Sequence, residues 1–368
     1  EKIALESLYL RSTGAKFQRP EAPPLSEMHA LEVFFESMHG RRWINFQGWL
    51  GRKATANTRG VAPFCSHPWC WAGVQCGIGT IEGLVLPGNQ LQGVLPGAAL
   101  GALSGLAVIN LSNNEIEGAL PPDLGTLRRL RSLNCAVSKL EGPIPDTLGL
   151  LTGLQELDLS FGRLSGRLSQ SLGCCTRLNV LNLSQNQLSG TIPEELGELR
   201  ALRELRVAHN SLHGVIPDTL GNLVRLRILA MSCNHLEGPL PRWLGQLTNL
   251  QRLQLDENHI HGAFPQSMKH LGDLEVLHLQ RNRLSGKLPR WLGNLTSLRV
   301  INLSHNDLTG TIPVECGNLT RLVSLELGFN FITGPLPPVL GQLTRLLDFH
   351  VMEGQQSYSL PLRRGFRR

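Results

Sequence analysis

The chain has 368 residues, a formal net charge of +6 and 17% charged residues. It contains no run of 18 or more apolar residues, so the sequence predicts no membrane-spanning helix. A compact chain of this length would usually divide into domains, whereas a repeat protein of the same length can form one elongated domain. The arginines near the end make residues 362–368 a basic tail, which is either a segment for an anionic surface or a solvated terminus.

The first 80 residues contain no regular repeat and predict a helical cap. Two amphipathic segments, within residues 1–13 and 26–38, place apolar side chains on one helical face. They resemble each other at a spacing of 26 residues, because Gly14 matches Gly40 and Phe17 matches Trp43. The cap helix therefore looks duplicated, and residues 51–67 are predicted to form an exposed loop.

From residue 81 to 361 a pattern of 24 residues recurs. Its clearest copy surrounds Leu181 and Leu183, which alternate with polar residues as on a short strand with one buried side. Gly190 permits a tight bend, and Pro193 ends strand-like pairing before a short helical or 3₁₀ segment. One unit cannot bury its apolar side alone, so the pattern predicts about eleven stacked units and a degenerate twelfth.

One position of each unit carries an asparagine whose amide can bond the backbone of the neighbouring unit. The resulting ladder is predicted at Asn89, Asn114, Ser138, Gly162, Asn186, Asn210, Asn234, Asn258, Asn282, Asn306 and Asn330. Ser138 and Gly162 replace asparagine in the third and fourth units. We expect looser stacking or a different curvature near residues 134–170, caused by sequence drift or by a binding feature.

These residues match the consensus of the leucine-rich repeat. The Leu-x-Gly-x-Ile-Pro half of the unit, as at residues 188–193, resembles the plant-type subclass. That subclass occurs in ectodomains of receptor-like proteins and receptor kinases and in algal proteins. The resemblance covers residues 81–361 and implies an α/β solenoid, a right-handed superhelix with a parallel β-sheet on its concave face. Short helical or 3₁₀ segments would cover the convex face, and a helical cap would close the N-terminal end.

The resemblance also bears on the cap. The family usually carries one cap helix followed by Gly-x-x-Trp, so the second copy, with Gly40 and Trp43, resembles the cap itself. Cys70 and Cys76 fit the family's cap disulfide, although their spacing is one residue shorter than the commonest form. The resemblance therefore implies a Cys70–Cys76 disulfide, with Cys65 as a competing partner.

The other five cysteines are predicted to be free thiols, because they occupy repeat positions where cysteine serves as a small hydrophobic residue or lies near the rim. They are Cys135, Cys174, Cys175, Cys233 and Cys316. Sequons for N-linked glycans occur at Asn110, Asn182, Asn294, Asn302 and Asn318. The sequons and the resemblance favour an extracellular or membrane-facing location, and the free thiols leave a cytoplasmic location as the alternative.

No P-loop, zinc-protease, hydrolase-elbow or kinase signature occurs, so we expect no enzymatic activity, no cofactor and no metal centre. The outward strand positions carry ten basic and twelve acidic residues. Nucleic-acid binding requires a surface of one sign, so this balance disfavours it. The predicted partner is a protein or peptide on the concave face.

The candidate ligand-binding residues lie in the fourth to eleventh units. Five histidines, one per unit, could form a pH-sensitive patch, bind a metal or simply be exposed polar side chains. Arginines and acids surround them, and phenylalanines could anchor a ligand or pack against the ladder. The predicted set is Phe161, Arg163, Arg206, His209, His235, Arg252, Asp256, Glu257, His259, His278, Arg281, Arg283, His305, Phe329 and Phe331.

Three functions follow from the resemblance. The first is a non-catalytic recognition domain of a receptor-like protein, with a possible co-receptor. The second is an intracellular scaffold or the repeat arm of a larger signalling enzyme, such as a GTPase or kinase. The third is a secreted inhibitor of cell-wall-degrading enzymes, which is weakened because such inhibitors end in a cysteine pair and no cysteine follows Cys316.

Overall fold

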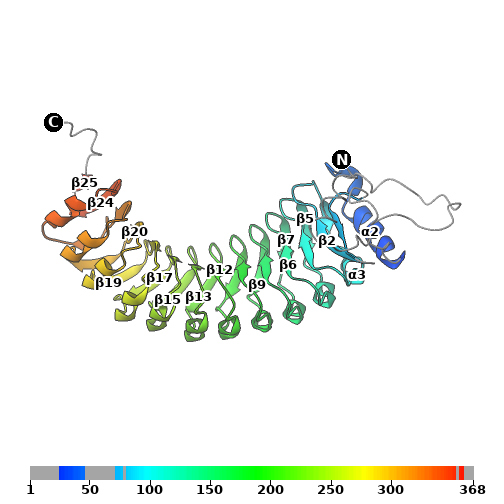
Figure 1. Cartoon of the computed structure of the whole chain (residues 1–368), viewed down its shortest axis with the longest axis horizontal. Helices are drawn as coiled ribbons and strands as arrows, with labels where there is room; N and C mark the ends of the chain where they lie inside the picture. The colour runs from blue at the N-terminus through cyan, green and yellow to red at the C-terminus, as the bar shows by residue number, and fades with distance from the viewer. Residues whose placement is uncertain (1–24, 46–70, 78–79, 354–355, 360–368) are drawn as a thin grey trace, which may run out of the picture.

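A computed structural model describes residues 25–45, 71–77, 80–353 and 356–359. Figure 1 shows an open arc, with α2 (Leu25–Ser37) at one end and the hairpin of β24 (Asp348–Glu353) and β25 (Gln356–Ser359) at the other. Short helices lie along the outer edge of the arc (Figure 1). The first cap copy, the predicted loop, Cys65, Cys70 and the basic tail lie outside the described residues.

A first sheet of 14 strands runs the length of the arc, and each repeat contributes one strand to it. The strands are parallel except at the two edges, where β1 and β25 run antiparallel to their neighbours. In spatial order this sheet contains β1 (Val74–Cys76), β2 (Ile81–Val85), β4 (Val108–Asn110), β6 (Ser132–Asn134), β8 (Glu156–Asp158), β10 (Val180–Asn182), β12 (Glu204–Arg206), β14 (Ile228–Ala230), β16 (Arg252–Gln254), β18 (Val276–His278), β20 (Val300–Asn302), β22 (Ser324–Glu326), β24 and β25.

A second sheet of 11 strands follows the first, because each repeat re-enters an extended conformation after its ladder position. It contains β3 (Gln92–Val94), β5 (Glu115–Ala119), β7 (Lys139–Gly142), β9 (Arg163–Arg167), β11 (Gln187–Gly190), β13 (Ser211–Val215), β15 (His235–Pro239), β17 (His259–Gly262), β19 (Arg283–Lys287), β21 (Asp307–Gly310) and β23 (Phe331–Ile332). A short helix completes each of the first eleven repeats. These helices are α3 (Gly97–Ala102), η2 (Pro122–Thr126), η3 (Asp146–Leu150), η4 (Gln170–Cys174), η5 (Glu194–Glu198), η6 (Asp218–Asn222), η7 (Arg242–Gln246), η8 (Gln266–His270), η9 (Arg290–Asn294), η10 (Val314–Asn318) and η11 (Pro338–Gln342).

The leucine spine sets the register of the stack. Leu181 pairs with Leu157 in the preceding repeat and with Leu205 in the following one, and all three side chains are buried. Their neighbours along each strand point to the other side of the sheet, as the period of two requires. The spine buries apolar surface only because repeats stack. The predicted α/β solenoid, with parallel strands and 3₁₀ segments, is confirmed.

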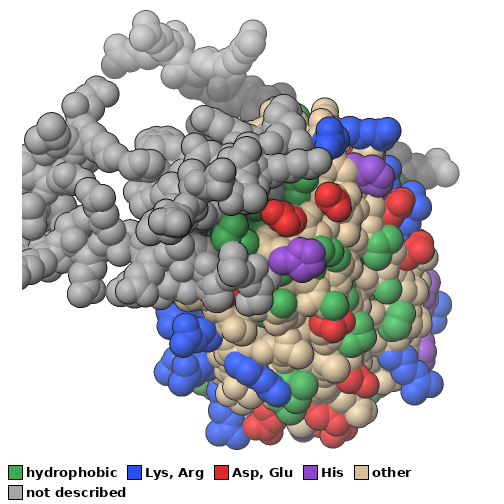
Figure 2. Space-filling view, turned by 90° about the vertical axis from the view of Figure 1, so that its right-hand side faces the viewer, with side chains coloured by type: hydrophobic (Ala, Val, Ile, Leu, Met, Phe, Trp, Pro, Cys, Tyr) green, Lys and Arg blue, Asp and Glu red, His purple; other side chains and the backbone are tan. Residues whose placement is uncertain are grey.

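The N-terminal end of the spine is covered by α2 and η1 (Gly40–Arg42). Leu31, Phe34 and Met38 are buried against the first repeat, and Trp43 Nε1 donates to Met38 O at 2.8 Å. Glu27 is also buried, because its carboxylate accepts hydrogen bonds from Thr80 Oγ1 and from the backbone N–H of Ile81. The second cap copy thus closes the stack. Figure 2 looks onto this end, and basic, acidic, histidine and hydrophobic side chains are interspersed on the part of the surface that the grey atoms leave open.

The asparagine ladder has the predicted chemistry. Asn258 Nδ2 donates to the carbonyls of Met231, Leu255 and Asp256, and its Oδ1 accepts from Leu236 N–H at 2.9 Å. One side chain therefore satisfies backbone groups in two repeats. The same set of bonds recurs at Asn210, Asn234, Asn282, Asn306 and Asn330.

The ladder is interrupted in the third and fourth repeats. Ser138 Oγ lies 3.5 Å from Leu140 N within its own repeat, and Gly162 has no side chain to contribute. The backbone stack nevertheless continues, since Ser138 N donates to Phe161 O at 3.2 Å and Gly162 N to Gln185 O at 3.1 Å. Strands β6, β8 and β10 keep the same register as their neighbours. The register shows no shift across residues 134–170.

Candidate ligand-binding face

The exposed side of the first sheet is built by alternation within each strand. In β12, Leu205 is buried, while Glu204 and Arg206 are half-buried and face outward. The chain continues outward once more at Ala208 and then turns at His209, which has a φ of 54°. Left-handed φ values recur at this turn position in repeat after repeat, for example at Phe161, where they carry a steric cost for non-glycine residues.

The 15 predicted site residues fall in three groups according to their place in the repeat. Four belong to the first sheet or its outward continuation, namely Arg206, Arg252, Asp256 and His278. Six occupy the turn position with positive φ, which we call the turn column: Phe161, His209, Glu257, Arg281, His305 and Phe329. The other five begin strands of the second sheet: Arg163, His235, His259, Arg283 and Phe331.

The concave placement of those last five residues was wrong. The turn and the ladder residue redirect the chain, so the residue that follows the ladder position pairs within the second sheet. His235 and His259 stack there with ring centroids 5.9 Å apart. Of the five predicted histidines, His278 alone lies on the first sheet. The histidine patch is therefore divided between surfaces.

The centre of the first sheet carries an ordered polar group. Arg206 Nε and Nη2 each lie 3.0 Å from Glu204 Oε2. Asp256 accepts a short hydrogen bond from Ser232 Oγ in the preceding repeat. Burial lowers the pKa of His278, Asp256 opposes this shift and Arg252 adds to it. Beside them, the buried Gln280 Oε1 has no hydrogen-bond partner.

Several neighbouring side chains of the turn column, to which Cys233 with a φ of 54° also belongs, contact one another. Cys233 Sγ lies 3.4 Å from Glu257 Oε2, and Glu257 pairs with Arg281 at 3.5 Å. Burial and the hydrogen bond to Glu257 raise the pKa of Cys233 to about 12, so the thiol stays protonated. Further along, His305 stacks on Phe329 with ring centroids 4.1 Å apart. Phe161, Phe329 and Phe331 are all more than half exposed and do not pack into the ladder.

Three of the sequon asparagines have a structural role on the first sheet. Asn302 Oδ1 accepts from both the N–H and the Oγ of Ser304, at 3.1 and 2.8 Å, and Asn110 makes the same pair of bonds with Ser112. Asn182 Nδ2 also donates to Asp158 Oδ2 at 3.2 Å. The Asn-Leu-Ser sequence of the strand thus supports a local side-chain turn. Asn294 and Asn318 instead end η9 and η10 on the outer edge and are exposed.

The prediction of exposed residues counted only as far as the first residue after each ladder position, so it missed His213 and His261. Both are exposed, and they lie on β13 and β17, next to His235 and His259. The signal was available in the period of two, which places the first and third residues after the ladder on the same side. Among the described residues, no group of three or more His, Cys, Asp or Glu side chains is placed to hold a metal ion.

Comparison with known proteins decides the family. Three leucine-rich repeat families match the sequence, as a leucine-rich repeat region over residues 195–364 and as leucine-rich repeats over 152–212 and 105–127. The chain belongs to the leucine-rich repeat family. Its matches extend over both sheets and most of the candidate face.

The solved structures similar to this leucine-rich repeat chain include a plant receptor. The Arabidopsis receptor kinase HAESA, in complex with the peptide hormone IDA and the co-receptor SERK1, is 32% identical with a TM-score of 0.78. That match covers 90% of this chain and 54% of the HAESA chain, so this chain spans about half of its length. A plant ice-binding protein is 26% identical with a TM-score of 0.69, over 86% of this chain and 97% of that one. A curated relative, the probable inactive receptor kinase RLK902 of Arabidopsis thaliana, is 40% identical over 60 residues, which are 16% of this chain and 9% of the relative.

The cysteines of the leucine-rich repeat chain divide as predicted. Cys135, Cys174, Cys175, Cys233 and Cys316 are free, and Cys76 is disulfide-bonded. Both candidate partners of Cys76 lie outside the described residues, so the pairing with Cys70 stays a prediction. Burial raises the pKa of Cys135 and Cys316 to about 12, which makes these thiols inert.

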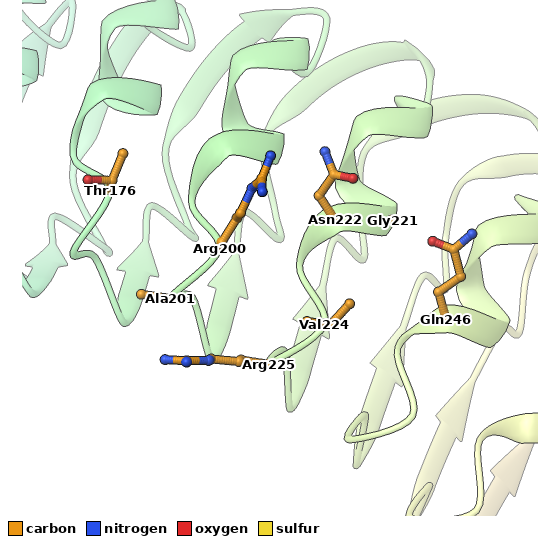
Figure 3. A pocket seen from close by; sticks show the side chains of 8 residues that line it. All are labelled: Thr176, Arg200, Ala201, Gly221, Asn222, Val224, Arg225 and Gln246. Atoms are coloured by element: carbon orange, nitrogen blue, oxygen red, sulfur yellow. The ribbon is translucent and has the colours of Figure 1, made fainter.

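Away from the candidate face, the outer edge carries a hollow of about 620 Å³ between consecutive repeats. It is lined by Thr176, Arg200, Ala201, Gly221, Asn222, Val224, Arg225 and Gln246, whose side chains are drawn in Figure 3. Its two arginines come from the loops that lead from a 3₁₀ helix back to the first sheet. Within the described ranges, no helix is both long and apolar enough to cross a bilayer.

Proposed function

We propose that this chain is a non-catalytic recognition domain of a receptor-like protein. It binds an extended peptide on the exposed side of the first sheet and on the adjoining turn column, between β10 and β22. The ligand is a protein or peptide rather than a nucleic acid, and a co-receptor is a further expected partner.

The surface chemistry of the central repeats carries this proposal. Val180, Ile228, Val276 and Val300 share one half-exposed column of the first sheet, in which Glu204 and Arg252 are interspersed with them. Arg206 and Asp256 lie on neighbouring columns, and the turn column adds exposed aromatic rings. Aliphatic side chains interspersed with charged groups and exposed aromatics are the composition of peptide and protein interfaces.

The size of the face suits a peptide of moderate length. Adjacent strands are ~4.8 Å apart, so the seven strands from β10 to β22 extend over ~29 Å. An extended peptide rises ~3.3 Å per residue, and nine residues would cross the face.

The HAESA structure supports the same proposal, because it is a complex of the receptor with a peptide hormone and a co-receptor. We extend that arrangement to this chain at the level of ligand class only. This chain matches only about half of the HAESA chain. Membrane anchoring and downstream signalling are therefore proposed for the whole receptor-like protein and not for this domain.

A display library of random nine- to twelve-residue peptides would test the binding face. The folded chain should enrich a family of sequences, and a variant with Arg206→Ala, Arg252→Ala and Asp256→Ala should lose them. A matched control with Arg200→Ala and Arg225→Ala, in the hollow of the outer edge, should retain them. Enrichment that survives on the first variant and disappears on the second would refute a concave binding face.

We also propose an extracellular or membrane-facing location, supported by the disulfide of Cys76 and by the exposed sequons at Asn294 and Asn318. Non-reducing peptide mapping of protein from its native source should find Cys76 linked to Cys70 and glycans on the outer edge. A reduced Cys76 and unmodified sequons would instead favour an intracellular scaffold.

A further inference from the structure

The second sheet carries a row of four exposed histidines on three neighbouring strands. His213 lies on β13, His235 on β15, and His259 and His261 on β17. In the strand register His213 is paired with His235, and the rings of His235 and His259 stack 5.9 Å apart with an interplanar angle of 21°. We call these four residues the histidine row.

The charged groups around the histidine row balance at neutral pH. Glu237 is paired in register with His259, and Arg283 with His261. In the adjoining turn column, Glu257 and Arg281 form an ion pair at 3.5 Å. Two acids thus offset two bases, His209 is a further titratable neighbour in the turn column, and Lys287 on β19 adds one positive charge in the repeat that follows Ala263.

An apolar row runs beside the histidine row on the same sheet. Val215, Pro239 and Ala263 are exposed and occupy the same position in three consecutive repeats. Each lies against the glycine of the next repeat, since a Cβ added at Gly238 would meet Val215 Cγ1 at 2.9 Å. A Cβ added at Gly262 would likewise meet Pro239 Cβ at 3.8 Å, so a glycine of the next repeat lies beside each of these apolar side chains.

We propose that the histidine row and the apolar row together form a pH-gated docking surface for an acidic peptide segment of a partner protein. Imidazole is the side chain whose charge changes between pH 5 and 8. Protonation of the row would change a balanced surface into one with four added positive charges. Protonated His235 and His259 would repel each other across their stack, and a carboxylate placed against both rings relieves that repulsion.

The apolar row selects a peptide over a uniformly charged polymer, because an alternating peptide can place carboxylates on the histidines and aliphatic groups on Val215 and Pro239. This surface belongs to the second sheet, whereas the extended peptide of the proposed function occupies the first sheet and its turns. Each of the two proposals can therefore be refuted without affecting the other.

The probe for this surface is an eight-residue peptide of alternating aspartate and valine with blocked ends. Aspartate carboxylates remain ionised at pH 5.5, so only the protein changes charge. Isothermal titration at pH 7.5 and 5.5 should show binding that is about tenfold tighter at the lower pH. A peptide of alternating asparagine and valine should show no such gain.

Two variants make the assignment specific. Glutamine at all four positions of the histidine row should abolish the gain, while His29→Gln with His270→Gln, two exposed histidines elsewhere, should keep it. Circular dichroism at both pH values confirms that each variant is folded. The proposal is overturned by equal affinity at the two pH values, by no binding at pH 5.5, or by a gain that persists without the histidine row.

Discussion

The seventh to tenth repeats and the third and fourth repeats share one backbone but differ in their ladders. Asn234, Asn258, Asn282 and Asn306 are buried and bond two repeats each, whereas Ser138 makes one weak contact and Gly162 none. The backbone bonds at these positions are nonetheless alike, at 3.2 Å from Asn234 N and 3.1 Å from Gly162 N. The leucine spine and strand pairing therefore set the shape, and the amide ladder adds stability to a shape already determined.

A charge in the spine should have the largest effect and should not distinguish the two regions. Leu157→Asp in the fourth repeat and Leu253→Asp in the eighth each bury an unpaired carboxylate where the leucine is fully buried. We expect each to destabilise the fold by about 4 kcal/mol or more, measured by thermal unfolding. Leu150→Asp, at a leucine that is 45% exposed, is the matched control and should be nearly neutral. A mild effect at Leu157 alone would show that the spine is looser there.

Removal of the ladder amide should separate the two regions. Asn258→Ala leaves the buried Leu236 N–H and three carbonyls without their partner, so we expect a loss of about 2–3 kcal/mol. Ser138→Ala removes one 3.5 Å contact and should cost under about 0.5 kcal/mol. Native-state hydrogen exchange, read repeat by repeat, measures both because local opening reports local stability. Equal costs would mean that the ladder is not the source of the difference.

The comparison also shows what the sequence could predict. The spacing of Leu181, Asn186 and Pro193 predicted the strand, the ladder and the 3₁₀ segment, because each residue has one role set by backbone chemistry. Spacing could not predict which sheet receives the residue after the ladder, since that depends on the direction of the turn at the left-handed position. His235 and Arg283 were therefore placed on the wrong sheet. Glu27 escaped prediction because its partners, Thr80 and Ile81, lie more than 50 residues away.

Restoring the ladder should stabilise the interrupted region. In Ser138→Asn the new Nδ2 would reach the carbonyl acceptors that Asn258 uses in its repeat, and its Oδ1 would reach the N–H of Ile116. We expect a gain of about 1 kcal/mol, seen as slower hydrogen exchange in the second and third repeats. The reverse change, Asn234→Ser, should lower the free energy of unfolding by at least as much as Ser138→Asn raises it. A destabilised Ser138→Asn protein would indicate that the turn at this repeat cannot accept the amide.

A smaller gain in stability is expected from a substitution in the turn that precedes Ser138. Val137 has a φ of 56°, which is unfavourable for a β-branched residue, and its side chain is 45% exposed. Val137→Asn keeps a side chain that tolerates the left-handed region and should add about 0.5–1 kcal/mol to the free energy of unfolding. Val94→Asn, at an exposed valine within β3, is the control and should be neutral or slightly destabilising. A gain at both valines would point to solubility rather than to backbone strain.

The smallest expected effect is a pH dependence of the intact region, where His278 is half-buried. Because burial lowers the folded-state pKa of His278, the unfolded chain binds more protons once the pH falls below about 6.5. Stability should therefore fall as the pH drops through 6.5 toward the folded pKa, and it should be unaffected above that range. Hydrogen exchange of the ninth repeat at pH 7.5 and 5.5, corrected for intrinsic rates, should show this loss in the parent protein and not in His278→Gln. The third and fourth repeats present Asn134 and Asp158 at the same column and serve as the internal reference. An equal loss in the ninth repeat of both proteins would place the proton uptake on another histidine.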